Sequence, residues 1–79
     1  MQVRVRLLGT LSSHYSGQYP AAGLDISIPV GATVAELVDA TGIPRERVAI
    51  VTINGLLARA DDPVPDQAVV KFMQPVTGG

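Results

Sequence analysis

The residues with the most distinctive chemistry are the two glycines that end the sequence, Gly78 and Gly79. A glycine has no Cβ, so its backbone adopts dihedral angles that are closed to other residues and can approach another molecule closely. Chain ends are often loose, so a glycine pair has an ordinary interpretation as a frayed terminus. The alternative is a tail whose terminal carboxylate must enter a narrow site, and the surrounding sequence has to decide between the two.

Other chemistry-bearing residues are few. The chain has no cysteine, which excludes a disulfide, a thiolate metal site and a cysteine nucleophile. The only histidine, His14, is interpreted as a surface side chain, and Asp61, Asp62 and Asp66 as turn residues rather than metal ligands. There is no Ser-His-Asp set and no phosphate-binding loop. We therefore expect no metal site and a carrier or binding protein rather than a catalyst.

Length and composition set further bounds. A chain of 79 residues is one small domain, and 47% of it is hydrophobic with a mean hydropathy of +0.31. We expect part of this apolar surface to stay exposed for a partner. The net charge of −1 favours neither nucleic acid nor an anionic membrane. No apolar run approaches the roughly 18 residues of a membrane span, and no secretory signal is visible, so a cytoplasmic location is expected.

The elements that would position the tail can be predicted from periodicity. Residues 3–7 and 24–28 alternate between apolar and polar side chains, which is typical of half-buried strands, and Pro29 should end the second one. The connection over residues 9–23 is long, and residues 11–16 could form a helical turn within it. These two strands can pair as a hairpin.

One helix is predicted from its capping signals. Thr33 followed by Glu36 forms a capping box, and Gly42 stands where a left-handed C-terminal cap belongs, with Pro44 blocking continuation. The side chains that helical spacing places on the inner face are Val34, Leu37, Val38 and Thr41.

Three further strands are predicted after this helix. Residues 48–53 are almost wholly apolar and β-branched, Asn54-Gly55 is a strong two-residue hairpin signal, and residues 56–58 form a short return strand. Residues 67–74 form the last strand.

This order of elements predicts an α+β fold in which one main helix packs on one face of a mixed sheet of four or five strands. With a right-handed crossover through the helix, the arrangement is the β-grasp, with the first and last strands parallel and adjacent at the sheet centre. The chain is then a single domain over 1–79, in which residues 75–79 form a flexible tail that leaves a central strand.

The sequence resembles the ubiquitin-like sulfur-carrier family, also called the MoaD/ThiS family, and within it the molybdopterin synthase small subunit. The residues that carry this resemblance are 33–37 at the helix start, 53–55 at the turn, and 69–79 in the last strand and tail. Many members have a second aromatic residue and a proline where this chain has Met73 and Gln74. This difference alters the surface that a partner would meet.

The resemblance implies a specific chemistry for the tail. The Gly79 carboxylate is coupled to AMP by an adenylating enzyme of the ubiquitin-activating type, which uses ATP, and sulfur from a persulfide donor then displaces AMP. The product is a thiocarboxylate that donates sulfur to molybdopterin biosynthesis after the tail threads into the larger synthase subunit. The threading residues are Pro75, Val76, Thr77 and Gly78. The chain itself would be a non-catalytic carrier without a bound cofactor.

Partner docking is expected on the outer face of the sheet. If the side chains that alternate with the core point outward on adjacent strands, they form a mixed basic and apolar patch of Arg4, Arg6, Leu8, Lys71 and Met73. A flexible methionine suits a surface that meets more than one partner. The ordinary interpretation is that scattered charged and apolar side chains occur on any protein surface.

Three alternatives remain open at this point. The same sulfur chemistry could serve thiamine thiazole, cysteine or tRNA thiolation. The chain could be a ubiquitin-like modifier that is conjugated to proteins through Gly79, although its single lysine, Lys71, makes self-chains a poor expectation. It could also be a β-grasp binding module with an inert tail.

Overall fold

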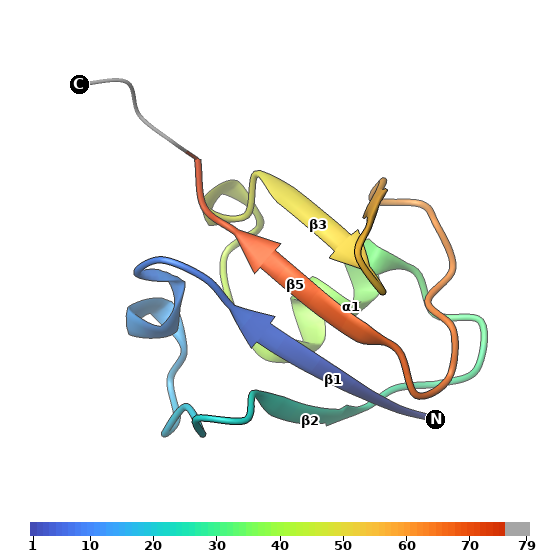
Figure 1. Ribbon diagram of the computed structural model, residues 1–79, viewed down its shortest axis with the longest axis horizontal. Helices are drawn as coiled ribbons and strands as arrows, with labels where there is room; N and C mark the ends of the chain where they lie inside the picture. Colours follow the sequence, from blue (N-terminus) through green and yellow to red (C-terminus); the bar gives the residue numbers. More distant parts are fainter. Residues whose placement is uncertain (76–79) are drawn as a thin grey trace.

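The computed structural model describes residues 1–75 and contains one mixed sheet, one α-helix and two short 3₁₀ helices (Figure 1). In chain order the elements are β1 (Gln2–Leu7), η1 (Leu11–His14), β2 (Leu24–Ser27), α1 (Val34–Thr41), η2 (Arg45–Arg47), β3 (Ile50–Ile53), β4 (Leu56–Ala58) and β5 (Val69–Met73). This is the predicted order, with η2 added between the helix and β3.

The sheet has five strands in the order β2-β1-β5-β3-β4. β1 and β5 are parallel neighbours, whereas β1–β2, β3–β5 and β3–β4 are antiparallel. The fold is therefore the predicted ubiquitin-like β-grasp. Because β5 is the central strand, the chain reaches Gln74 and Pro75 from the most firmly held part of the sheet.

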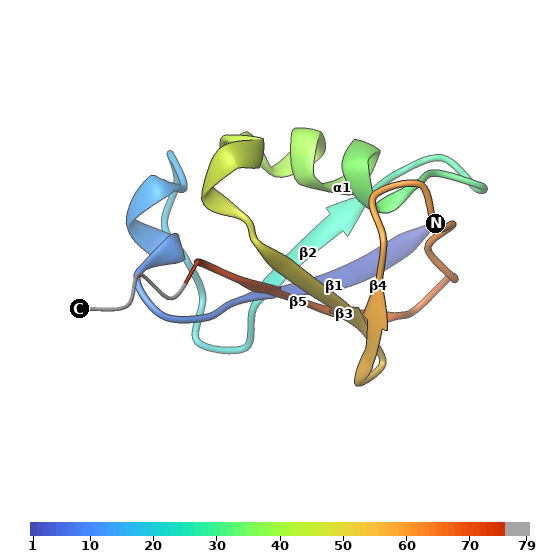
Figure 2. The ribbon, with the colours of Figure 1, turned by 90° about the horizontal axis from the view of Figure 1, so that it is seen from above.

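Helix α1 covers one face of the sheet and leaves the other face open (Figure 2). The residues predicted for its inner face are buried, and Leu37 is 0% exposed. They meet the alternate residues of the strands, so the core forms a single cluster that includes Val3, Val5, Leu11, Val70 and Phe72. Among residues 1–75, no helix combines the length and apolar character needed to cross a membrane.

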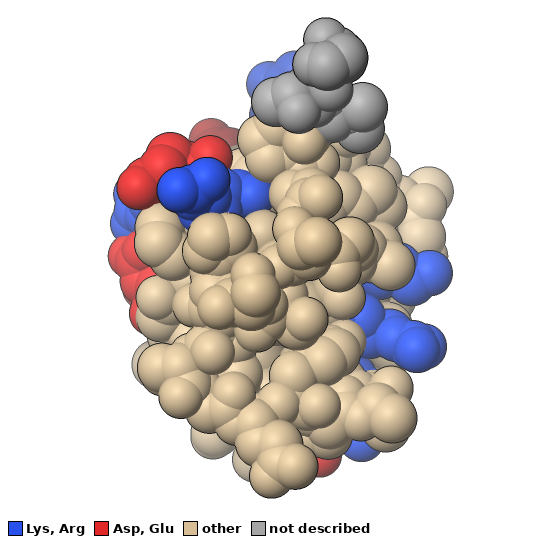
Figure 3. All heavy atoms as spheres, turned by 90° about the vertical axis from the view of Figure 1, so that its left-hand side faces the viewer, with Lys and Arg blue, Asp and Glu red and all other residues tan. Residues whose placement is uncertain are grey.

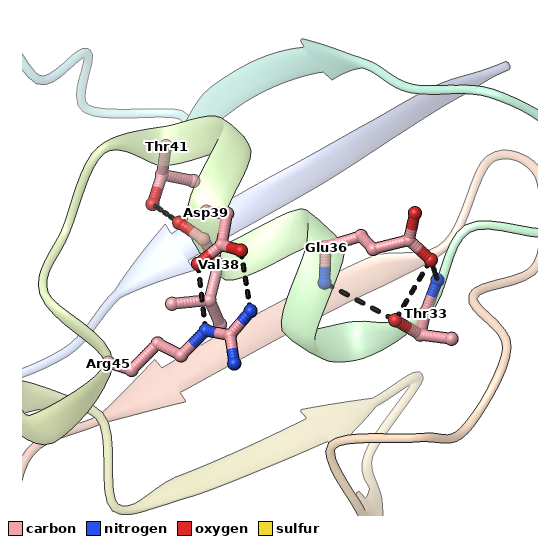
Figure 4. A network of polar contacts seen from close by, with 6 residues as sticks. All are labelled: Thr33, Glu36, Val38, Asp39, Thr41 and Arg45. Atoms are coloured by element: carbon pink, nitrogen blue, oxygen red, sulfur yellow. Dashed lines mark hydrogen bonds and ion pairs between the residues drawn. The ribbon is translucent and has the colours of Figure 1, made fainter.

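Both predicted caps of α1 are present, and Figure 4 shows the one at its start. The Glu36 amide donates to Thr33 Oγ1 over 3.3 Å, and the Thr33 amide donates to Glu36 Oε1 over 3.0 Å, which completes the capping box. At the other end Gly42 adopts φ 79°, a left-handed conformation that glycine tolerates. The buried Thr41 hydroxyl donates to the Val38 carbonyl over 2.6 Å and is thus satisfied.

Two predicted strand boundaries were wrong. β3 begins at Ile50 rather than at residue 48, because the Val48 amide donates to the Arg45 carbonyl and closes the η2 turn. β5 begins at Val69 rather than at residue 67, because Gln67 has φ 63°, which a strand cannot accommodate.

The long connection over residues 9–23 is held against the core rather than projecting from it. Leu11, at the start of η1, is 0% exposed, and Tyr15 and Tyr19 pack against the core cluster. The Leu7 amide donates to the Tyr19 hydroxyl over 2.9 Å, so the tyrosine also satisfies a backbone group at the end of β1. The segment and its helical turn are therefore part of the folded body beside the end of β5.

Candidate functional site at the end of the central strand

The end of β5 is fixed by the residue that follows it. Gln74 is half-buried, and its Oε1 accepts hydrogen bonds from the Thr10 amide over 3.1 Å and from the Thr10 hydroxyl over 2.6 Å. Thr10 belongs to the turn that leads from β1 into η1. The residue directly before the predicted tail is therefore attached to a turn that lies 64 residues earlier in the chain.

A shallow polar cavity of about 250 Å³ lies beside this attachment point. Its walls come from η1, which contributes His14, and from η2, which contributes Glu46 and Arg47, with Gln74 and Pro75 between them. Pro75 is exposed, so the chain leaves the folded body from between two short helices. The other predicted tail residues, Val76, Thr77, Gly78 and Gly79, lie outside the residues that the structure describes.

The predicted docking residues lie together on the outer face of the sheet. In the parallel β1–β5 pair, Arg6 is the register partner of Lys71. Arg4, two residues earlier in β1, is the register partner of Val69. Arg4 also forms an ion pair with Asp25 of β2, with its Nη2 2.9 Å from Oδ1. The register thus brings the predicted side chains onto one surface.

The apolar part of this face is larger than the sequence predicted. Leu8 and Met73 were predicted, and the register of β3 against β5 adds Ile50 opposite Met73. Val69 and Leu57 are also exposed, at 38% and 76%. The predicted strand 48–53 is apolar except for Thr52, so its alternation was too weak for its outward side chains to be identified.

Figure 3 shows the side of the molecule on which β5 ends. A broad uncharged surface fills the centre of this view, with cationic side chains along one margin and a group of mixed charges at another. The segment between Arg6 and Asp25 contains no Asp, Glu, Lys or Arg, so none of the charged side chains in this view comes from it.

The second ion pair is on the helix side of the molecule (Figure 4). Arg45 donates from Nε to Asp39 Oδ1 over 2.8 Å and from Nη2 to Oδ2 over 2.6 Å. The hydrogen bond from Arg45 lowers the pKa of the Asp39 carboxyl, and the same contact raises the pKa of Arg45. This pair joins the end of α1 to η2 and takes no part in the outer face of the sheet.

Two of the aspartates considered as metal ligands accept hydrogen bonds from backbone amides. Asp62 Oδ2 accepts from the Arg59 amide over 2.8 Å, and Asp66 Oδ1 accepts from the Gln2 amide over 3.2 Å. Within the described residues no group of three or more His, Asp or Glu side chains is arranged to hold a metal ion.

Several solved structures are similar to this one. SAMP1 from Haloferax volcanii superposes with a TM-score of 0.74 at 17% identity and covers 100% of both chains. A second structure of that protein, small archaeal modifier protein 1, has a TM-score of 0.72 at 19% identity. The putative molybdopterin converting factor subunit 1 from Pyrococcus furiosus has a TM-score of 0.71 at 20% identity, covering 95% of this chain and 98% of that chain. These likenesses show the fold.

Membership of a family rests on sequence. No curated protein matches the chain. The model of the ThiS family matches residues 15–79, which include helix α1, the Asn54-Gly55 turn, the central strand β5 and the final glycines. The chain therefore belongs to the ThiS family, whose members are ubiquitin-like sulfur carriers or modifiers of the β-grasp fold.

Proposed function

We propose that this protein is a sulfur carrier that holds its cargo as a thiocarboxylate on Gly79. One observation carries the proposal: the family match runs to residue 79 and so includes the glycine pair. The position of β5 supports it, since the tail follows directly from the central strand of the sheet. The lack of cysteine also supports it, because the chain has no thiol on which to carry sulfur.

The chemistry has three balanced steps. An adenylating enzyme transfers AMP from ATP to the Gly79 carboxylate and releases pyrophosphate, which makes a good leaving group at the carbonyl. The terminal sulfur of a persulfide attacks that carbonyl, and AMP leaves as an acyl disulfide forms. A thiol then reduces the disulfide bond and releases the thiocarboxylate. Glycine is suited to this end of the chain because it allows close approach at the reacting carbonyl.

For the destination of the sulfur we favour molybdopterin biosynthesis, with this chain as the small subunit of the synthase. The support is the likeness in fold to a putative molybdopterin converting factor subunit 1 and the resemblance of residues 69–79 to that type. In this role the chain is a protein co-substrate without catalytic groups of its own. Its partners are an adenylating enzyme, a persulfide donor and a larger synthase subunit, and its location is cytoplasmic.

Intact mass tests the carrier function. The chain is incubated with its adenylating enzyme, ATP and a persulfide donor, and should gain the mass difference between sulfur and oxygen. Deletion of Gly79 should abolish the gain, whereas the control Gly31→Ala, in an exposed loop before α1, should keep it. A chain that remains a carboxylate under conditions in which a known carrier is converted would overturn the proposal.

A protein modifier is the second candidate function. It is favoured by the likeness to small archaeal modifier protein 1, although that likeness is one of fold. The activated Gly79 would then form an amide with a lysine amine of a target protein and release AMP. Denaturing gels of whole-cell extract test this candidate: discrete higher-mass conjugates that disappear when Gly79 is deleted would establish it, and their absence would exclude it.

A further inference from the structure

Two cations lie side by side at the centre of the outer sheet face. Arg6 of β1 and Lys71 of β5 are register partners in the parallel pair. Like charges on directly opposed strand positions destabilise a sheet. Arg4, two residues earlier in β1, is paired with Asp25. Within residues 1–75, no carboxylate lies in ion-pair distance of Arg6 or Lys71. The fold therefore tolerates a local electrostatic cost at this position.

β3, the next strand, supplies no group that compensates the repulsion between Arg6 and Lys71. Thr52 of β3 is the register partner of Lys71 on its other side. Its Oγ1 is buried and has no hydrogen-bond partner within the described residues. A buried polar atom without a partner is unusual in a native fold and calls for an explanation. The row from β1 to β3 thus holds two uncompensated cations and an unsatisfied hydroxyl.

Apolar side chains border this row. Leu8 and Ile50 flank it toward the end of β5, with 39% and 44% of their surfaces exposed, and Val69 flanks it on the opposite side at 38%. Lys71 is half-buried among them. A charge that is partly withdrawn from water and ringed by apolar groups interacts more strongly with an opposite charge than a fully solvated one does.

We propose that the Arg6–Lys71 pair receives an acidic side chain of the adenylating enzyme, the first protein that takes the tail. That protein would present a carboxylate surrounded by apolar residues, and the carboxylate would sit between the guanidinium and the ammonium group. Lys71 lies four residues before Pro75 on the strand that leads into the tail, so a protein that engages the tail reaches this row in the same encounter. The assignment rests on the proposed function and specifies the chemistry of its docking partner.

Adenylation kinetics test this assignment. Carrier-dependent ATP–pyrophosphate exchange by the adenylating enzyme is measured against the concentration of the full-length chain at low and high salt. Arg6→Gln and Lys71→Gln should each raise the KM for the carrier on the order of fivefold at low salt and leave kcat unchanged. Arg59→Gln, which removes one positive charge from an exposed position just after the edge strand β4, is the matched control and should keep the wild-type KM.

Two further readouts separate this role from a structural one. The KM of the wild type should rise with salt, and that of the Arg6→Gln/Lys71→Gln double variant should rise less, because the screened contact is gone. In the free chain, Arg6→Gln should leave the melting temperature unchanged or raise it, because it relieves the repulsion from Lys71.

The outcomes are distinct. If the wild type supports exchange and the Arg6 and Lys71 variants match Arg59→Gln, the acidic contact is wrong and the sulfur-carrier function stands. If the wild type supports no exchange, both the acidic contact and the sulfur-carrier function are wrong.

Discussion

Gln74 is joined to Thr10 by two hydrogen bonds that converge on a single oxygen, Gln74 Oε1, at 2.6 Å from the hydroxyl and 3.1 Å from the amide of Thr10. The two residues are 64 positions apart, at the end of the central strand and in the turn after β1. The contact holds the end of β5 to the folded body directly before the tail. If the chain acts as the proposed carrier, a fixed strand end lowers the conformational entropy that is lost when a partner binds there.

Removing this contact should be measurable in the free chain. Gln74→Ala is expected to lower the free energy of unfolding by about 1 kcal/mol, because the amide of Thr10 loses its acceptor. Gln74→Glu keeps an acceptor oxygen and should retain most of the stability. Urea unfolding followed by circular dichroism gives the values, with the exposed Gln18→Ala as control. Equal losses for Gln74→Ala and Gln18→Ala would show that the contact does not hold the strand end.

The capping box of α1 allows a separate stability test. Thr33→Ala removes the side-chain acceptor of the Glu36 amide and should cost about 1 kcal/mol, whereas Thr33→Ser keeps the hydroxyl and should cost much less. The helix packs on the face of the sheet opposite the proposed docking face (Figure 2). Thiocarboxylate formation should therefore be unchanged in Thr33→Ala at temperatures where it is folded, and a loss of activity there would contradict this separation of the two faces.

Among the described glycines, Gly23 should be the least tolerant of a side chain, because it combines a positive φ of 98° with a close backbone neighbour. A Cβ at this position would come within 2.8 Å of the Val5 carbonyl oxygen in β1, which is too close for a carbon atom. Gly31 has a similar φ of 89° and no atom within 4 Å of the corresponding point, so Gly31→Ala isolates the dihedral cost alone. We expect Gly23→Ala to lose about 2 kcal/mol more than Gly31→Ala in urea unfolding. Equal losses would mean that β1 shifts to accommodate the new Cβ without lowering the free energy of unfolding.

The Asp39–Arg45 pair predicts a small acid-dependent loss of stability. Because Arg45 lowers the pKa of Asp39 in the folded chain, its stabilising contribution is present above about pH 4 and is lost as the pH falls through the lowered pKa. Melting temperatures from neutral to acidic pH should show wild type above Asp39→Asn, with the difference shrinking in acid. Both side chains are exposed, so the difference should also shrink in high salt. A difference in melting temperature that persists at low pH would show that the Asp39–Arg45 ion pair is not its cause.

Local sequence signals predicted the fold and part of the candidate site. The capping residues around α1, the Asn54-Gly55 turn and the alternation in β1 each depend on near neighbours, and all were confirmed. The Gln74–Thr10 contact could not be predicted, because it depends on how a long connection folds back onto the end of β5. Ile50 was missed on the outer face for a different reason: in a run whose only polar residue is Thr52, the outward side chains are not evident until a partner strand sets the register.

The last prediction concerns Phe72, which is 0% exposed and lies on the inner face of the central strand, one residue after Lys71. Phe72→Ala should cost about 3–5 kcal/mol, which is comparable to the whole stability of a domain of this size. This variant should be largely unfolded at room temperature. Phe72→Leu should fold with reduced stability, and Met73→Leu, on the opposite face, should change stability by less than about 1.5 kcal/mol.

Amide hydrogen exchange tests the role of Phe72 in holding β5. If β5 is the rigid origin of the tail, its amides should exchange at the rate of global unfolding in the wild type and markedly faster in Phe72→Leu. Fast exchange of β5 in the wild type would mean that the tail does not leave from a rigid strand.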